Sequence, residues 1–148
     1  MKTKIITCFC ALAVAFIMLS AFQKDNKKEP WSHKELMPPS ELAEKLNKND
    51  LTNIVIFNIG PSGKIKNSLF IGAAQDEVNM LALKKKLEKL PKNKEVIIYC
   101  GCCPFEHCPN IRPAFQLAKD MGFNNVKLLN MPKNLKVDWI DKGYPMQQ

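Results

Sequence analysis

The stretch that most constrains the fold of this chain runs from residue 96 to residue 113. It begins with Val96-Ile97-Ile98-Tyr99, a run of β-branched and aromatic residues that predicts a buried strand. A glycine and four cysteines follow, and a helical pattern starts at Arg112-Pro113. A loop between a strand and a helix N-terminus favours anions, because free N–H groups and the helix dipole point into it. We therefore expect a thiolate at Cys100, where the strand ends.

Strand and helix patterns alternate along the rest of the chain. Apolar runs predict strands at 53–59, 69–71, 95–99 and 125–129. Helical spacing predicts four helices: from Ser40, which is expected to be the N-cap, from Asp76 to Pro91, from Pro113 to Gly122, and around Trp139. This order predicts one α/β domain with a mainly parallel sheet. In such a sheet the ligand crevice lies beyond the carboxyl ends of the strands, where Cys100 is placed.

The first residues have the layout of a secretory signal peptide. Lys2 and Lys4 precede an uncharged apolar run, which ends at the small residues Ser20-Ala21. We expect residues 1–21 to be a cleaved signal peptide, residues 22–36 a linker, and residues 37–148 the domain. The protein would then be periplasmic or secreted, without membrane contact after cleavage. An uncleaved membrane anchor is the alternative, although the apolar run is short for a span.

The charge of the chain gives no sign of a nucleic-acid partner. The formal net charge is +8, and every one of its 22 basic residues except Arg112 is a lysine. A protein that reads nucleic acid usually interleaves arginines with aromatic residues. We therefore expect a solvated, lysine-rich surface and no nucleic-acid binding.

Several features recur in a fixed order around the thiol loop. They are a strand ending in a cysteine, an anion-cradling loop, a helix running to Gly122-Phe123, and the ending Trp139-Ile140-Asp141-Lys142-Gly143-Tyr144-Pro145. Weaker matches upstream are Pro39-Ser40-Glu41-Leu42 and Phe70-Ile71-Gly72-Ala73. From about residue 37 to residue 145 the sequence thus resembles a rhodanese-like domain. The resemblance implies a single α/β domain whose mainly parallel central sheet is flanked by helices on both faces.

The loop departs from the family pattern. The family's loop commonly closes with an arginine and a serine soon after the cysteine, whereas here Asn110 and Ile111 close a longer loop. Asn58 and Gly60 stand where the family has an aspartate and an arginine. Only Cys100 carries over, as the nucleophile. The candidate substrate-binding loop comprises Gly101, Cys102, Cys103, Phe105, Glu106, His107, Cys108, Asn110 and Arg112.

The resemblance implies a sulfurtransferase. The Cys100 thiolate would take sulfane sulfur from a small donor as a persulfide and pass it to a thiol or another nucleophile. No cofactor is expected, and the protein is expected to be a monomer. Arg112 either adds positive charge to the loop or is an exposed side chain in the first helical turn. Glu106 and His107 are expected at a solvent-facing loop tip.

Two other functions would use the same cysteines. Thiol–disulfide exchange needs an activated thiol with a second thiol close by, and Cys108 is the candidate partner. A disulfide from Cys102 or Cys103 to Cys108 would instead stiffen the loop. A metal-binding module would take its ligands from Cys100, Cys102, Cys103, His107 and Cys108. Such a compact thiolate set suits copper(I), whereas zinc sites usually draw ligand pairs from two separated knuckles.

Overall fold

The computed structural model describes residues 29–148, so the predicted signal peptide and residues 22–28 of the predicted linker lie outside the described chain. The strands are β1 (Leu36–Met37), β2 (Ile54–Asn58), β3 (Ser68–Phe70), β4 (Glu95–Tyr99) and β5 (Asn125–Leu129). The α-helices are α2 (Pro39–Asn47), α3 (Glu77–Leu87), α4 (Ile111–Asp120) and α5 (Leu135–Asp138). Three short 3-10 turns complete the order: η2 (His33–Glu35), η3 (Phe105–His107) and η4 (Ile140–Lys142). No helix within residues 29–148 is long and apolar enough to cross a membrane.

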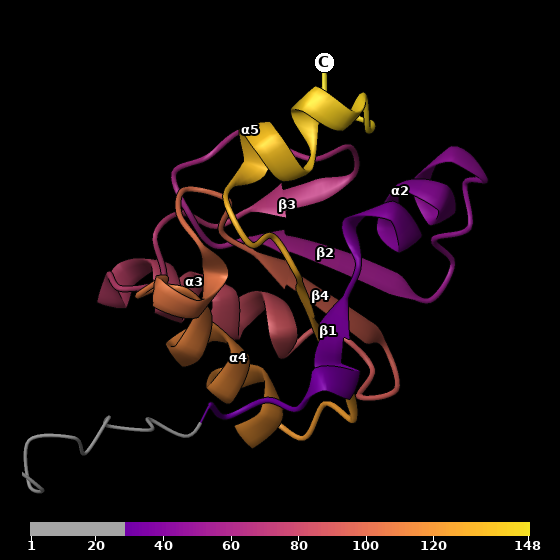
Figure 1. The fold of residues 1–148 in the computed structure, drawn as a ribbon. Coiled ribbons are helices and arrows are strands. Elements are labelled where there is room, and N and C mark those ends of the chain that lie inside the picture. The colour runs from indigo at the N-terminus through magenta and orange to yellow at the C-terminus, as the bar shows by residue number, and fades with distance from the viewer. Residues whose placement is uncertain (1–28) are drawn as a thin grey trace, which may run out of the picture.

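The five strands form one sheet in the order β1-β5-β4-β2-β3. Every pair of neighbouring strands is parallel, and β4 lies in the middle, between β5 and β2 (Figure 1). The predicted parallel sheet is therefore confirmed. A strand in this position is covered on both faces, which explains why β4 is apolar throughout its buried residues Val96 to Tyr99 rather than alternating with polar residues.

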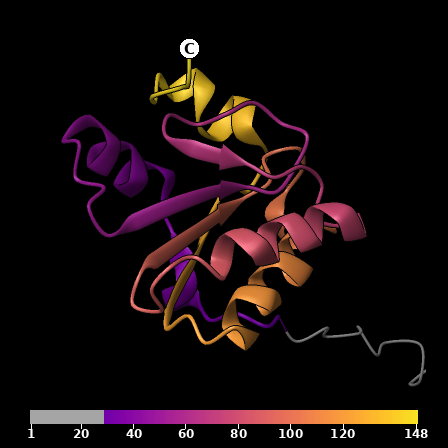
Figure 2. The ribbon, with the colours of Figure 1, turned by 180° about the vertical axis from the view of Figure 1, so that it is seen from behind.

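Helices cover both faces of the sheet, as the resemblance implied (Figures 1 and 2). Helices α3 and α4 pack on one face, whose core includes Val96, Ile98 and Cys100. Helices α2 and α5 pack on the other face, whose core includes Ile97 and Tyr99. Successive side chains of a strand point to opposite faces, so Cys100 continues the row of Val96 and Ile98 toward α4.

The segment before β1 packs on the domain, contrary to the linker predicted there. Trp31 lies against Phe105 and Phe115, with ring centroids 6.2 and 5.8 Å away. Leu36 pairs with Leu128 at the sheet edge. An aromatic ring of this size buries a large apolar area, so residues 29–36 belong to the folded unit although their sequence is charged.

The N-terminus of α2 also differs from the prediction. The N-cap is Pro38, and Pro39 occupies the first helical position, where its missing N–H costs no hydrogen bond. Ser40 therefore lies inside the first turn and is exposed. The fixed backbone angle of Pro39 starts this helix, rather than a hydroxyl cap at Ser40.

Candidate functional site

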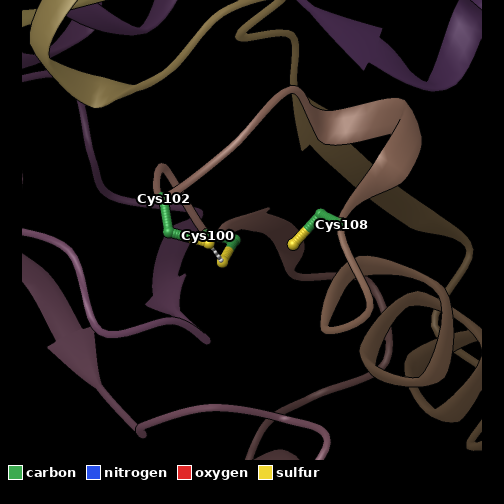
Figure 3. Close-up of side chains that lie close together, drawn as sticks. All are labelled: Cys100, Cys102 and Cys108. Carbon is green, nitrogen blue, oxygen red and sulfur yellow. Dashed lines mark hydrogen bonds between the residues drawn. The ribbon is translucent and has the colours of Figure 1, made fainter.

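The candidate site is the loop that follows β4, and its centre is Cys100. This residue comes directly after the last residue of β4 and is only 1% exposed. The side chains of Cys100, Cys102 and Cys108 converge in this loop (Figure 3). Their three Sγ atoms lie within 4.8 Å of one another. The structure thus brings together three of the four loop cysteines.

The three sulfur atoms differ in their access to solvent. The Sγ atoms of Cys100 and Cys102 are 3.2 Å apart. Cys100 and Cys108 are buried, whereas Cys102 is exposed. The Sγ atom of Cys103 lies 3.3 Å from that of Cys102, and Cys103 is partly buried against the core. The contact from Cys100 to Cys102 therefore links the buried sulfur to an exposed thiol.

Hydrogen bonds stabilise the thiolate form of Cys100. The thiol of Cys108 makes the largest contribution, and the backbone amide and thiol of Cys102 and the side-chain amide of Asn110 add to it. Together they outweigh the cost of burying a charge and lower the pKa of Cys100 from 9.0 to about 5. Partial burial and the hydrogen bond to Cys100 raise the pKa of Cys102 to about 12. The pKa of Cys108 is also raised, chiefly because its thiol donates to Cys100.

Asn110 connects the start of α4 to the thiolate. It is the N-cap of α4, it is 3% exposed, and its Nδ2 donates to the Sγ of Cys100 at 3.4 Å. Its Oδ1 accepts a hydrogen bond from the backbone N–H of Gln75 at 2.9 Å, which fixes the orientation of the amide group. The sequence predicted a cradle of backbone amides for Cys100. The hydrogen bonds that lower its pKa come instead from two thiols, one side-chain amide and one backbone amide.

The turn after β2 forms a wall of the site. The resemblance pointed to its Asn58 and Gly60 as family positions, but not to a role for them beside Cys100. A Cβ atom at Gly60 would lie 2.3 Å from the Sγ of Cys100, so only glycine fits there. Asn58 holds this turn, because its Oδ1 accepts from the N–H of Gly60 at 3.1 Å and its Nδ2 donates to the carbonyl of Ser62 at 3.0 Å. The hydroxyl of Ser62 in turn donates to the carbonyl of Cys100. The signal available in the sequence was a polar residue, Asn58, and a nearby glycine, Gly60, at the end of an apolar strand.

Gly101 turns the chain so that its two neighbouring cysteines meet. Its φ is +76°, a conformation that favours glycine. A Cβ atom here would lie 2.8 Å from both the Cβ of Leu135 and the hydroxyl oxygen of Ser62. Its carbonyl accepts a hydrogen bond from the N–H of Leu135 at 2.9 Å. The turn is therefore held firmly against α5.

Arg112 contacts the N-terminal segment. Its guanidinium pairs with the carboxylate of Glu29 and donates to the backbone carbonyl of Glu106 at 2.8 Å. It also lies over the ring of Trp31, 5.3 Å from the centroid. Because Glu29 compensates its charge, Arg112 holds the N-terminal segment against the loop. This role differs from both predicted roles.

The tip of the loop is formed by η3. Phe105 is buried beneath it and donates through its N–H to the carbonyl of Met131 at 3.4 Å. Glu106 and His107 are exposed, as expected for a solvent-facing tip. His107 does not belong to the group of sulfur ligands.

The four loop cysteines are free thiols in the structure. The expected disulfide from Cys102 or Cys103 to Cys108 is therefore not formed in it. The Sγ atoms of Cys102 and Cys108 nevertheless lie within 4.8 Å of each other. For the oxidised protein this pairing stays a prediction.

Two solved structures from Anabaena sp. are similar to this chain. The solution NMR structure of the rhodanese-like domain of the Alr3790 protein is 17% identical, with a TM-score of 0.57, and the match covers 76% of this chain and 78% of that one. The crystal structure of the Alr3790 protein is 14% identical, with a TM-score of 0.54, covering 75% and 90% of the two chains. The parallel sheet, the helices on both faces and these matches define a rhodanese-like fold. The resemblance noted in the sequence is thus confirmed for the fold.

Neither the protein-family models nor the curated proteins contain a match to this chain. Within this fold, the loop after β4 of this chain carries the group formed by Cys100, Cys102 and Cys108.

Proposed function

We propose that this protein carries sulfane sulfur as a persulfide on Cys100 and passes it to a thiol acceptor. The observation that carries the proposal is the environment of Cys100 at the carboxyl end of the central strand. Cys102 and Asn110 hydrogen-bond its Sγ atom there, and together with Cys108 they lower its pKa to about 5. A thiol with this pKa is almost wholly thiolate at neutral pH, and the thiolate is the nucleophile. Export to the periplasm or beyond is part of the proposal and rests on the signal-peptide pattern of residues 1–21.

The charge around the site favours a particular class of donor. Thiosulfate is a dianion, and its binding calls for a compensating cation. The guanidinium of Arg112 is already paired with Glu29, and the donors to Cys100 are uncharged thiol and amide groups. We therefore infer that the donor is a low-molecular-weight persulfide or a polysulfide, rather than thiosulfate.

The test follows sulfur onto Cys100 in the full chain. Reduced protein is incubated with cysteine persulfide, or with thiosulfate in parallel, trapped with an alkylating reagent and analysed by peptide mapping. In Cys102→Ser we expect one additional sulfur atom on the Cys100 peptide with cysteine persulfide and less with thiosulfate, and we expect none on this peptide in Cys100→Ser.

The variant Cys102→Ser is included because a thiol 3.2 Å from Cys100 can consume the adduct. Sulfur found equally on Cys103 or Cys108, or no sulfur on Cys100 in any variant, would contradict the proposal. Cys103→Ser is the control variant: it also removes one loop thiol, but it leaves all the donors to Cys100 in place.

A second candidate function is the binding of a soft metal ion, and one observation favours it. The three Sγ atoms of Cys100, Cys102 and Cys108 lie within 4.8 Å of one another, which suits a thiolate-rich copper(I) site. Of the five predicted ligands, His107 lies outside this group, and so does Cys103. Titration of the reduced protein with copper(I) against a competing chelator tests this function. Binding that survives in His107→Ala but is lost in Cys108→Ser is expected.

A further inference from the structure

The surroundings of Cys100 raise the question of how a bound sulfur atom leaves. Cys100 is 1% exposed and is enclosed by Gly60, Asn110 and Cys108. The exposed side chain next to its sulfur is that of Cys102, with the two Sγ atoms 3.2 Å apart. Of the two side chains that hydrogen-bond this sulfur, Asn110 is buried and Cys102 is the one that solvent reaches.

We propose that Cys102 resolves the Cys100 persulfide by forming a Cys100–Cys102 disulfide and releasing the sulfane sulfur as hydrosulfide. This inference deepens the proposed function and rests on it, because it needs a persulfide on Cys100. It gives the protein a further activity, the reduction of sulfane sulfur to sulfide. It also assigns to Cys102 a role that the sequence offered to Cys108.

The step balances without an added oxidant. The thiol of Cys102 gives its proton to the outer sulfur of the Cys100 persulfide, and the resulting Cys102 thiolate attacks the Sγ of Cys100. The Cys102–Cys100 bond forms while the bond from Cys100 to the outer sulfur breaks. The electron pair of the broken bond leaves with the outer sulfur, which departs as HS⁻. The two cysteines are oxidised to a disulfide and the sulfane sulfur is reduced.

Gly101 prepares the two thiols for this reaction. Its left-handed backbone, with φ at +76°, folds the chain back so that the cysteines on either side face each other. Contacts with Leu135 and Ser62 hold that conformation. The disulfide would close a ring containing a single intervening residue. Strained and exposed disulfides of this kind are the easily reduced ones, so an external thiol can reopen it at the exposed Cys102.

Cys108 is less suited to the resolving role. It is completely buried, so neither the departing hydrosulfide nor an incoming reductant has access through it. Its thiol is the largest cause of the lowered pKa of Cys100, which is a stabilising function. Cys103 contacts Cys102 rather than Cys100. Among the described thiols, Cys102 alone combines contact with Cys100 and exposure.

The experiment follows the fate of one sulfur atom in the full chain. Reduced protein without free oxygen receives cysteine persulfide, and sulfide release, intact mass and trapped peptides are measured over time. Peptide mapping keeps the signals of Cys8 and Cys10 apart from those of the loop. For the unmodified protein we expect released sulfide, the loss of two hydrogen atoms in mass, and a mapped Cys100–Cys102 disulfide.

The variants separate the possible outcomes. Cys102→Ser is expected to keep the additional sulfur on Cys100 and to lose both the disulfide and the sulfide release. Cys103→Ser is expected to form the Cys100–Cys102 disulfide as the unmodified protein does. A persulfide on Cys100 that lasts equally long with and without Cys102, or a disulfide mapped to Cys108, would overturn the inference while leaving the proposed function intact. Absence of sulfur from Cys100 even in Cys102→Ser would overturn both. The disulfide mapping on the unmodified protein tests the inference even if a variant does not fold.

Discussion

Replacing Cys108 with alanine tests the hydrogen bonds that hold the Cys100 thiolate. The thiol of Cys108 is the largest cause of the lowered pKa of Cys100, which lies at about 5. A hydrogen bond to a charged group contributes about 1.5–3 kcal/mol, and one pKa unit corresponds to about 1.4 kcal/mol. Cys108→Ala is therefore expected to raise the pKa of Cys100 by about 1–2 units. Cys108→Ser keeps a donor of similar size and should change the pKa much less.

The assay is the pH dependence of alkylation of Cys100, followed by peptide mapping under reducing conditions. At pH 6 a thiol of pKa 5 is about 90% thiolate, whereas a thiol of pKa 6–7 is roughly 10–50% thiolate. The rate at this pH should therefore fall about two- to tenfold in Cys108→Ala, with a smaller decrease if the more basic thiolate is a better nucleophile. A midpoint that does not move in Cys108→Ala, or that moves equally in Cys108→Ser, would refute the role assigned to this thiol.

Three other predictions test the surroundings of the site. Gly60→Ala should lower the free energy of unfolding by about 1–3 kcal/mol, since the added Cβ would lie 2.3 Å from the Sγ of Cys100 and 2.8 Å from its carbonyl oxygen. Urea denaturation measures this change, and an unchanged midpoint would contradict the prediction. Trp31→Ala should lower the free energy of unfolding by roughly half of the ~3–5 kcal/mol that is lost with a fully buried aromatic ring, because Trp31 is only partly buried against Phe105 and Phe115. The same denaturation curves test this, and His33→Ala is the exposed control from the same segment. The free energy of unfolding should rise from about pH 5 toward pH 9 more steeply in the unmodified protein than in Cys100→Ser. The reason is that in this range the unfolded chain holds a proton on Cys100 that the folded chain has lost. A steeper rise in Cys100→Ser would exclude a lowered pKa of Cys100.

The sheet and its central strand could be predicted from the sequence because their signal is local. Strand β4 has the predicted bounds Glu95–Tyr99, and β5 has the predicted bounds Asn125–Leu129. After Glu95, β4 is a run of apolar residues, which suits burial on both faces of a parallel sheet. In β5, Val126, Leu128 and Leu129 are buried. The position of Cys100 at the carboxyl end of β4 followed from the same pattern.

The partners of the loop could not be predicted because they come from distant parts of the chain. Arg112 pairs with Glu29, 83 residues away, and no local pattern points to that pair. Gly60 approaches Cys100 only because β2 and β4 are neighbours in the sheet. The charged neighbours of Trp31 predicted a linker, but the partial burial of its ring against Phe105 and Phe115 holds this segment on the domain.

The spacing of the cysteines also left open which thiols meet. A C-x-C segment brings its two sulfur atoms together only if the intervening residue turns the chain, and φ at Gly101 depends on packing against Leu135 and Ser62. The sequence permits this turn through its glycine but does not require it. The contact between Cys100 and Cys102 is therefore a property of the tertiary structure.

The roles proposed for the three cysteines rest on their surroundings, because Cys100 and Cys108 are buried and Cys102 is exposed. A thiolate at Cys100 can be buried at low cost only if neighbouring groups donate hydrogen bonds to it, and a buried thiol at Cys108 is suited to that task because its own ionisation is disfavoured. The exposed thiol of Cys102, 3.2 Å from the same sulfur, contributes less to the lowered pKa, yet it is the one that solvent, a leaving sulfide or an external reductant can reach. If burial decides the roles, a substitution of Cys108 should act mainly on the pKa of Cys100, and a substitution of Cys102 mainly on the lifetime of the persulfide. Equal effects of both substitutions on both measurements would mean that the three sulfur atoms act as one unit, as in a metal site, rather than as a nucleophile, a donor and a resolving thiol.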